Sequence, residues 1–555
     1  MTGVATPWED SYPPGLSAGM EIETFPVNDL VSEAAAKWPD RPALDFRGRK
    51  ITYAELAAAI DIAAGRFVSL GVLPGDRVAL LLPNTPWHPV CFFGALKAGA
   101  TVVHASPLDS PRVLAHKLSD SGAKLLLTTN LGPLAEKAAE FAASGMNAQL
   151  IVCEDAFWGA SADTGTFPTN GGIAVWNDLE GDAMPALSQP VSGDTLALLQ
   201  YTGGTTGLPK AAMLTHDNLS AAVSSYENWY EGWKLLTDEP DKILLYLPLF
   251  HIYGLSTVML RSLRTGNELW LRTRFDPAEA LDDIEAGVTV FPGVPTMWIA
   301  ICAVPGFEKR DLSSLRIAAS GGAPMPVEVA ARFRAKTGLE LVGGWGMSET
   351  APAGTNLPFG RPDKAATIGI PLPGVFVRIV SLDDPKEEMP VGETGELAVR
   401  GKNVTTSYYN RPEENASAFV DGWFLTGDIG FMDEEGFFTI VDRKKDMIIS
   451  GGFNVYPQMI EQAVYEHDDV EEVLVIGIPD DYRGEAAKAF IKLRDGASPM
   501  SLEKLRAYLK GRVGPHELPA ALEIRADLPK TPVGKLSKIE LKQEEAERRK
   551  TAQAS

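Results

Sequence analysis

Cysteine and histidine are scarce in this chain of 555 residues, and neither is spaced like a set of metal ligands. The three cysteines, Cys91, Cys153 and Cys302, stand far apart and form no CxxC pair. This spacing disfavours both a disulfide framework and a cysteine zinc site. The seven histidines show no HxxxH pattern either. We therefore expect neither a disulfide scaffold nor a histidine–cysteine zinc centre.

Positive charge is also in deficit. Lysine and arginine together number 51 against 73 aspartates and glutamates, which gives a formal net charge of -22. We expect no nucleic-acid partner, because nucleic-acid phosphates are bound by basic surfaces. The deficit still leaves room for a local cationic pocket that binds a nucleotide.

Long apolar runs are lacking as well. No uninterrupted apolar stretch approaches the roughly 18–20 residues needed to span a bilayer. The first residues, MTGVATPWEDSYPP, have neither the basic region nor the apolar region of a secretory signal. We expect a cytoplasmic location, and peripheral membrane contact stays open.

The chain does contain an alternation of strand-like and helix-like segments. The stretch ALDFRGRKITY predicts two short strands that turn at Arg47-Gly48. Thr52 and Glu55 follow with capping-box spacing before a helical pattern. Similar alternation continues over the next hundred residues. It predicts an α/β fold with layered, mostly parallel sheets.

The length of the chain and a change in its sequence pattern after about Gly374 predict two domains. A chain of this size is too long for one hydrophobic core. After about Gly374, turn-rich acidic segments lead to the charged cluster DRKKD at residues 442–446. We predict a large N-terminal domain with several subdomains over residues 1–441, a hinge at 442–446, and a small, mobile α+β domain over 447–555.

The stretch YTGGTTGLPKAAMLTH, residues 201–216, concentrates glycine and threonine between two apolar runs. Glycines let a backbone turn tightly and point several N–H groups into one concavity, which binds phosphate oxygens. Hydroxyl groups and a lysine add donors and positive charge. A plain turn between strands is the alternative, and GxxxxGK[ST] is absent, so a P-loop is disfavoured. The candidate phosphate-binding residues are Thr202, Gly203, Gly204, Thr205, Thr206, Gly207 and Lys210.

This stretch resembles the signature of the adenylate-forming family, which includes acyl-CoA synthetases, nonribosomal adenylation domains and beetle luciferases. Five more motifs follow in the family's order. They are YLPLFHIYG (246–254), SGGAPMP (320–326), GGWGMSET (343–350), the long GWF…VYP run (422–457) and LPKTPVGKLSK (528–538). The resemblance covers almost the whole chain, from about Asp29 to Lys542. The 422–457 run is most similar to bacterial medium- and long-chain fatty-acyl-CoA synthetases.

The resemblance implies an enzyme, an AMP-forming acid–thiol ligase that uses ATP, CoA and Mg²⁺. It would convert a medium- or long-chain fatty acid, or a dicarboxylic acid such as pimelate, into acyl-AMP and then acyl-CoA. Alternatives stay open: a stand-alone adenylation enzyme that loads a carrier protein, an aryl-CoA ligase, a luciferase-like oxygenase, or a non-catalytic nucleotide sensor.

The family motifs imply a nucleotide site. The glycine–threonine loop would wrap the β- and γ-phosphates, and Glu349 with Thr205 would hold magnesium. Trp345 would stack on adenine, although a core tryptophan is the alternative. Asp428 would accept hydrogen bonds from the ribose hydroxyls. The further nucleotide-binding residues implied are Gly321, Gly322, Ala323, Gly344, Gly346, Thr350 and Arg443.

The motifs also imply catalytic and mobile residues. The ammonium of Lys535 would stabilise charge between the attacking carboxylate and the α-phosphate. Lys445 matches the family's hinge, and rotation there would bring Gly451 and Gly452 beside the pantetheine of CoA. His251 matches an aromatic position beside the acyl pocket, with a packed core histidine as the alternative. Reversible acetylation of Lys535 by a lysine acetyltransferase and deacetylase is a further hypothesis.

Three segments depart from the family's pattern. Lys535 is followed by Leu-Ser-Lys where many fatty-acyl relatives have an apolar residue and paired arginines. GPHELPA (514–520) stands where a lysine–proline element is common, so the CoA contacts are the least secure inference. GKNVTTSYYN (401–410) replaces the commoner GPQVMxGYWN, and no role is predicted for the change.

Overall fold

The structure, a computed structural model, describes most of the chain. The described residues are 6–143, 147–161, 163–165, 173–181, 191–202, 208–323, 325, 327–450, 453–480, 483–530 and 536–554. Predicted site residues that lie outside these ranges are Gly203, Gly204, Thr205, Thr206, Gly207, Gly451, Gly452 and Lys535. The chain divides into two compact units. One comprises Met1–Val377 and Val399–Phe419, and the other comprises Arg378–Ala398 and Val420–Ser555.

A seven-stranded sheet lies in the first unit. Its strands, in spatial order, are β7 (Ile173–Val175), β6 (Gln149–Cys153), β5 (Leu125–Thr129), β3 (Arg77–Leu80), β4 (Thr101–His104), β8 (Leu196–Thr202) and β9 (Lys210–Thr215). Neighbouring strands are parallel except β8 and β9, which form a hairpin. The five residues of β5 are all buried, as expected for a parallel strand covered on both faces.

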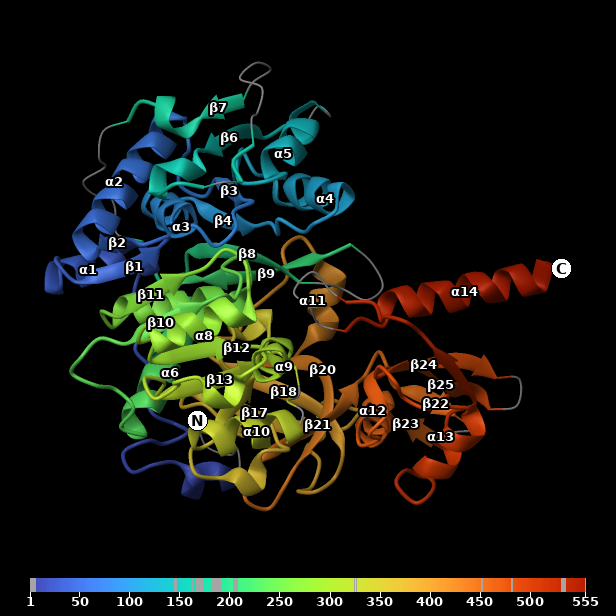
Figure 1. The fold of residues 1–555 in the computed structure, drawn as a ribbon. Helices are drawn as coiled ribbons and strands as arrows, with labels where there is room; N and C mark the ends of the chain where they lie inside the picture. Colours follow the sequence, from blue (N-terminus) through green and yellow to red (C-terminus); the bar gives the residue numbers. More distant parts are fainter. Residues whose placement is uncertain are drawn as a thin grey trace. The chain divides into compact units, whose positions relative to one another are not determined.

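Helices cover both faces of this sheet (Figure 1). They are α2 (Tyr53–Ser69), α3 (Trp87–Lys97), α4 (Pro111–Ser121) and α5 (Leu134–Ala143). Leu114 and Leu118 of α4 and Phe141 of α5 pack in one apolar cluster with residues of the strands. The predicted capping box opens α2: Thr52 accepts the N–H of Glu55, and Glu55 accepts the N–H of Thr52.

A nine-stranded sheet completes the parallel layers of the first unit. Its order is β16 (Ile370–Pro371), β15 (Thr355–Asn356), β14 (Leu341–Trp345), β13 (Ile317–Gly321), β12 (Val290–Gly293), β10 (Lys242–Leu245), β11 (Glu268–Leu271), β1 (Pro42–Phe46) and β2 (Arg49–Thr52). The strands from β14 to β1 are parallel, whereas β2, β15 and β16 run antiparallel to their neighbours. The strand pair predicted at Arg47-Gly48 is confirmed as β1 and β2.

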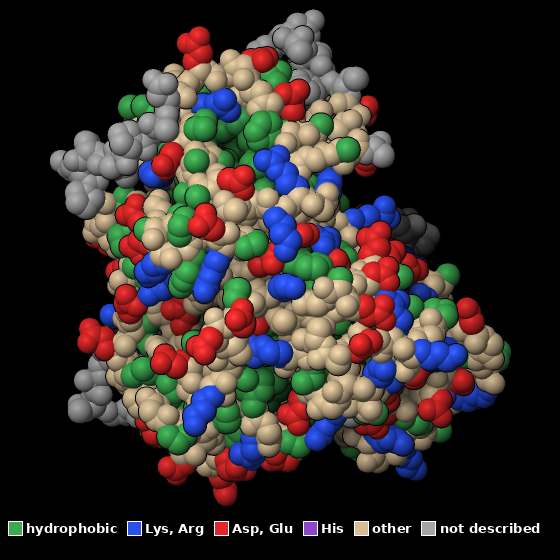
Figure 2. All heavy atoms as spheres, turned by 60° about the vertical axis from the view of Figure 1, so that its left-hand side comes forward, with side chains coloured by type: hydrophobic (Ala, Val, Ile, Leu, Met, Phe, Trp, Pro, Cys, Tyr) green, Lys and Arg blue, Asp and Glu red, His purple; other side chains and the backbone are tan. Residues whose placement is uncertain are grey.

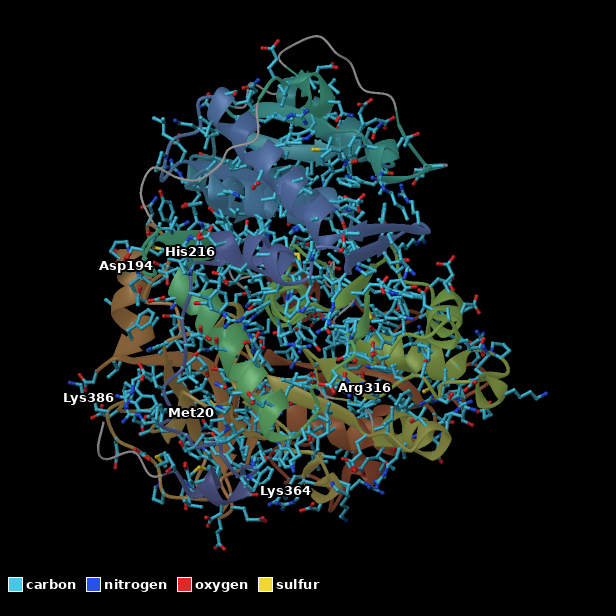
Figure 3. All side chains as sticks on the ribbon, turned by 90° about the vertical axis from the view of Figure 1, so that its left-hand side faces the viewer. Met20, Asp194, His216, Arg316, Lys364 and Lys386 are labelled. Atoms are coloured by element: carbon cyan, nitrogen blue, oxygen red, sulfur yellow. The ribbon has the colours of Figure 1, made fainter. Side chains whose placement is uncertain are left out.

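The helices associated with this sheet are α1 (Leu30–Lys37), α6 (His216–Gly232), the π-helix η5 (Tyr253–Leu260), α7 (Arg261–Arg264), α8 (Pro277–Glu285), α9 (Pro295–Ala303) and α10 (Val327–Thr337). α6 begins at His216, directly after β9 (Figure 3). Its first turn is capped by Thr215, which accepts the N–H of Asn218. The end of the β8–β9 hairpin is thereby joined rigidly to a long helix.

A five-stranded sheet follows in the chain and contains the division between the two units, which passes through β17 and β18. Its strands are β17 (Val375–Val380), β18 (Gly395–Gly401), β20 (Trp423–Met432), β19 (Phe419–Val420) and β21 (Phe438–Arg443), with the helix α11 (Pro412–Ala418) before β19. β20 and β21 are antiparallel and place Asp428 opposite Arg443.

The last sheet belongs to the second unit alone. It contains β23 (Phe453–Val455), β22 (Ile448–Ser450), β25 (Gly484–Leu493), β24 (Val470–Asp480) and β26 (Ala521–Ile524). Its helices are α12 (Pro457–Tyr465), α13 (Leu502–Leu509) and α14 (Ile539–Ala554). The predicted α/β architecture with a small α+β C-terminal part is confirmed. Within the described ranges, the structure contains no helix that is both long and apolar enough to cross a membrane.

Candidate active site

Two predicted motifs meet at the carboxyl ends of adjacent parallel strands. Ser320 and Gly321 at the end of β13 pair with Gly343 and Gly344 of β14. In open parallel sheets, ligands bind at this edge. A side chain on Gly321 would place its Cβ 2.9 Å from the ring of Tyr253, so only glycine lets the two segments approach this closely. The motifs SGGAPMP and GGWGMSET are therefore neighbours in space.

The end of β14 turns sharply at Trp345 and Gly346. A Cβ on Gly346 would lie 1.6 Å from the carbonyl oxygen of Pro352, which excludes every residue but glycine from this conformation. Trp345 is 9% exposed, and a Cβ on Gly354 would meet its ring at 2.5 Å. The backbone at Gly354 therefore packs closely against the Trp345 ring. The glycines on either side of Trp345 in sequence do not predict this contact.

Glu349 lies in the short 3-10 helix η7 (Ser348–Thr350) and is 4% exposed. The hydroxyl of Tyr408 donates to its Oε1 at 2.7 Å, and the backbone N–H of Thr405 donates to its carbonyl oxygen at 2.7 Å. Thr350 is fully buried, and its hydroxyl oxygen accepts the N–H of Met347 at 3.0 Å. The predicted metal-binding carboxylate is thus held on both its side chain and its backbone.

Lys210 contacts the same tyrosine that holds this carboxylate. It begins β9 opposite Thr202 of β8, so these two residues flank the glycine–threonine loop. Its Nζ lies 3.6 Å from the centroid of the Tyr408 ring. Burial lowers the pKa of the Lys210 ammonium, and the charge of Glu349 opposes that shift. Burial and the charge of Glu349 raise the pKa of Tyr408 far above its usual range, so the phenol keeps the proton that it donates.

The GKNVTTSYYN segment supplies site residues that the sequence analysis missed. The side-chain amide of Asn403 donates to the carbonyl oxygens of Thr350 and Ala353 at 2.7 and 2.6 Å. The hydroxyl of Thr405 donates to the carbonyl oxygen of Met213 at 2.6 Å. With Tyr408, these residues connect the Glu349 motif to β9. The sequence offered one signal for these residues, the departure of this segment from the family's pattern. That departure did not show which residues they contact.

Asp428 and Arg443 form a pair in the second unit. Arg443 Nε lies 2.7 Å from Asp428 Oδ1, and Asp428 is 1% exposed. Next to this pair in sequence, Gly427 donates its N–H to Glu396 Oε1 at 2.9 Å, and Lys444 Nζ lies 2.8 Å from Glu396 Oε2. A buried carboxylate on β18 therefore fixes the spacing of β20 and β21 beside the predicted ribose-binding pair.

A cavity of about 290 Å³ adjoins this pair. It is lined by Thr426, Gly427, Arg443, Lys444 and Lys445. Partial burial, and then the charge of Arg443, lower the pKa of Lys445. The predicted hinge residue therefore lines a small, cationic cavity beside the Asp428–Arg443 pair.

His251 is half-buried and precedes a π-helix. Its Nδ1 accepts the N–H of Tyr253 at 3.3 Å. The π-helix η5 begins at Tyr253, whose ring lies against Gly321, and π-helical turns are frequent at functional sites. The structure thus brings the LFHIYG and SGGAPMP motifs together through Tyr253, which was not a predicted site residue.

Two protein-family models match this chain. A model described as AMP-binding enzyme matches residues 31–409, and one described as AMP-binding enzyme C-terminal domain matches residues 459–535. The chain belongs to the AMP-binding enzyme family.

This AMP-binding enzyme is similar to curated relatives over most of its length. It is 37% identical over 560 residues to a long-chain-fatty-acid–CoA ligase of Bacillus subtilis (strain 168), covering 98% of each chain. It is 38% identical over 507 residues to a feruloyl-CoA synthase of Amycolatopsis sp, covering 91% of this chain and 96% of the relative. The expected resemblance to bacterial fatty-acyl-CoA synthetases is confirmed.

A solved structure of the o-succinylbenzoate CoA synthetase of Bacillus subtilis, in complex with ATP and magnesium ion, is also similar to this AMP-binding enzyme. The TM-score is 0.77 at 29% identity, and the match covers 92% of this chain and 98% of that chain. The expected fold class is confirmed by this likeness.

Proposed function

We propose that the protein is an ATP-dependent ligase that joins a medium- or long-chain carboxylic acid to CoA through an acyl-adenylate. The family and the long-chain-fatty-acid–CoA ligase at 37% identity support this proposal. The single observation that carries it is the meeting of Lys210, Tyr408 and Glu349 beside the β8–β9 hairpin. Lys210 follows in sequence a loop whose glycines and threonines suit phosphate oxygens, and Tyr408 links this cation to the carboxylate of Glu349.

The first half-reaction forms a mixed anhydride. A carboxylate oxygen of the acid attacks the α-phosphorus of ATP, and the bond to the β-phosphate oxygen breaks to release pyrophosphate. Catalysis of such a step rests on positioning and charge neutralisation rather than on a protein nucleophile. We assign charge neutralisation at the phosphates to Lys210 and the loop 202–207, and stabilisation of the attack to Lys535.

Binding of the nucleoside would rest on several groups. Asp428 would accept hydrogen bonds from the two ribose hydroxyls, since one carboxylate suits two donors. Arg443, whose Nε lies 2.7 Å from Asp428 Oδ1, would orient that carboxylate and contact the phosphate. Gly321, Gly322, Ala323, Gly344, Trp345 and Gly346 would supply the adenine-binding backbone and stacking face.

Magnesium suits the carboxylate of Glu349. The ion prefers oxygen ligands and commonly takes one or two carboxylates together with substrate phosphates. Among the described residues, no group of three or more histidine, cysteine, aspartate or glutamate side chains could hold a metal ion. When bound, magnesium would neutralise phosphate charge. Glu349 and Thr205 would hold it, and Tyr408 would keep the Glu349 side chain in place.

The second half-reaction transfers the acyl group to CoA. The thiolate of CoA attacks the acyl carbon, and the bond to the phosphate oxygen breaks to release AMP. We propose that residues 442–446 form the hinge that exchanges Lys535 for Gly451 and Gly452 between the two half-reactions, as the family resemblance implies.

AMP release from a panel of acids tests the proposed function. The panel should contain hexanoate, dodecanoate, pimelate and ferulate, each with and without CoA. We expect AMP release that requires both CoA and an aliphatic acid. Ferulate as the best substrate would favour an aryl-CoA ligase, which the 38% identity to a feruloyl-CoA synthase makes the second candidate. No release with any acid would overturn the proposal.

The variant Lys535→Ala tests the first half-reaction separately. It should abolish pyrophosphate release and still form acyl-CoA from supplied acyl-adenylate, because only the first step needs the ammonium. Acetylation of Lys535 would have the same effect by removing the charge. An unchanged rate of adenylate formation in this variant would contradict the assignment.

A further inference from the structure

Two buried histidines and a buried glutamine lie in neighbouring elements: His88 in α3, His104 in β4 and Gln200 in β8, the strand that leads to the phosphate loop. His88 of α3 is 0% exposed, His104 of β4 is 1% exposed, and Gln200 of β8 is 4% exposed. The ring centroids of the two histidines are 5.2 Å apart. The reaction outlined above uses none of these three residues.

Gln200 connects two functional segments through its amide. Its Nε2 donates to the carbonyl oxygen of Phe250 at 3.1 Å, and its Oε1 lies 2.9 Å from His104 Nδ1. Gln200 stands two residues before Thr202, where the phosphate loop begins. Phe250 stands immediately before His251. One side chain therefore joins the strand that leads to the phosphate loop to the segment that carries the candidate acyl-pocket histidine.

The hydrogen bonds also determine the protonation of His104. A carbonyl oxygen only accepts, so Gln200 must turn its NH₂ group toward Phe250 and its oxygen toward His104. His104 Nδ1 must then carry a proton and donate. Burial lowers the pKa of His104 to about 4, which keeps the ring neutral with this single proton. His104 thus orients the amide of Gln200 over the whole physiological pH range.

His88 provides the contrast within the same cluster. Neither of its ring nitrogens has a hydrogen-bond partner among the described residues, and burial lowers its pKa well below the usual range. It is as buried as His104 but makes none of the bonds that connect β8 to Phe250. Replacing His88 leaves no other buried polar group without its hydrogen bond, since its ring nitrogens have no partner among the described residues.

We infer that Gln200, oriented by His104, is a positioning residue that sets the Phe250–His251 segment for the incoming carboxylic acid. This inference rests on the proposed acid–CoA ligase activity. Because β8 is also held by backbone bonds to β4 and β9, the segment released by loss of the Gln200 amide is the one around Phe250. The acid, rather than ATP, should be the substrate most affected.

Steady-state kinetics of four full-length variants test the inference, with dodecanoate and ATP varied separately. Gln200→Leu and His104→Leu should each raise KM for dodecanoate about tenfold or more, with a smaller change in KM for ATP, since small displacements cost large factors. His104→Asn, whose amide can donate to Gln200, should restore KM to within about threefold. His88→Leu, the matched control, should leave both KM values unchanged. An unchanged KM for dodecanoate in Gln200→Leu, or equal effects in His88→Leu and His104→Leu, would overturn the inference.

Amide hydrogen exchange of residues 247–255 separates this inference from the proposed function. We expect faster exchange in His104→Leu and Gln200→Leu and wild-type exchange in His104→Asn and His88→Leu. This readout does not depend on turnover. If the wild-type protein releases no AMP with any of the acids while the exchange pattern holds, the proposed function fails and the positioning contact stands. Uniform exchange across the variants would refute the contact itself.

Discussion

Tyr408 is the single residue on which the geometry around Glu349 depends most. Its hydroxyl donates to Glu349 at 2.7 Å, and its ring faces the ammonium of Lys210 at 3.6 Å. The phenol is buried, and its pKa is raised, so it acts as a donor at every working pH. The hydrogen bond to Glu349 can be separated from the ring contact with Lys210, because phenylalanine keeps the ring and loses the hydroxyl.

The variant Tyr408→Phe is expected to bind magnesium more weakly while keeping its fold. A hydrogen bond to a charged group contributes about 1.5–3 kcal/mol, which corresponds to a loss of roughly 10–100-fold in kcat/KM. AMP release titrated with magnesium measures the effect, and higher magnesium should restore part of the activity. Tyr409→Phe, one residue along, is the control. Equal magnesium dependence in the two variants would show that the hydroxyl does not orient Glu349.

Glu227 of α6 is a second residue with a measurable signature. Burial raises the pKa of its carboxyl to about 7, and the facing charges of Arg264, Arg261 and Lys37 only partly offset this, while Glu23 adds to it. The folded state therefore holds a proton that the unfolded chain releases near its ordinary pKa. Between these two values, the folded state binds more protons, so stability falls as pH rises.

Removing this carboxyl should stabilise the protein at high pH. Glu227→Gln is expected to gain up to about 3 kcal/mol at pH 8 and close to nothing at pH 4. Urea unfolding at the two pH values measures the difference. The adjacent, exposed Glu231→Gln serves as the control on the same helix. A gain that is equal at both pH values would contradict a raised pKa at Glu227.

At the scale of elements, the turn after β14 depends on the absence of one side chain. A Cβ on Gly346 would lie 1.6 Å from the carbonyl oxygen of Pro352, so any other residue must displace the turn that leads to Glu349. Gly346→Ala is therefore expected to lower kcat/KM by about 100-fold, since catalysis is sensitive to displacements of about 1 Å. Gly19→Ala is the matched control, because nothing lies within 4 Å of its added carbon. Full activity in Gly346→Ala would show that the turn tolerates a shift.

Elements whose signals are local could be predicted from the sequence. The capping box of Thr52 and Glu55 and the strand pair at Arg47-Gly48 involve neighbours in the chain, and both are present. The positions of Glu349 and Lys210 followed from motifs. Tyr408 could not be predicted, because it meets Glu349 across 59 residues of sequence and only the fold brings them together. Likewise, Gly354 packs against the ring of Trp345, and this contact could not be predicted from the residues next to Trp345 in sequence.

At the scale of the whole molecule, charge is abundant and mixed in sign. On the face drawn in Figure 2, lysine and arginine side chains are interspersed with aspartate and glutamate. The excess of 22 negative charges coexists with cations gathered locally around Arg443, Lys444 and Lys445. Net charge therefore describes solubility and long-range repulsion, while local placement decides which anions bind.

The proposed hinge at residues 442–446 leads to a separate prediction about the half-reactions. Lys445→Pro fixes φ at the proposed hinge. This variant is expected to retain pyrophosphate release at close to the wild-type rate. Acyl-CoA formation from supplied acyl-adenylate should fall at least about tenfold, because only the second half-reaction needs the C-terminal domain to rotate. Lys444→Pro is unsuitable as a control, since Lys444 donates its N–H to Gly427. Exposed Lys504→Ala in the same unit is suitable. Equal loss of both half-reactions would argue against a hinge.

The carboxylate of Glu396 has a consequence for where such a turn can begin. This carboxylate accepts the N–H of Gly427 and pairs with the ammonium of Lys444. The backbone N–H of Lys444 also donates to the carbonyl oxygen of Gly427. Up to Lys444, the chain is therefore held to β18 beside Asp428 and Arg443, the proposed ribose-binding pair. Lys445 is the first residue after these contacts, so rotation about its backbone bonds, if it is the hinge, would leave the contacts of Glu396 intact.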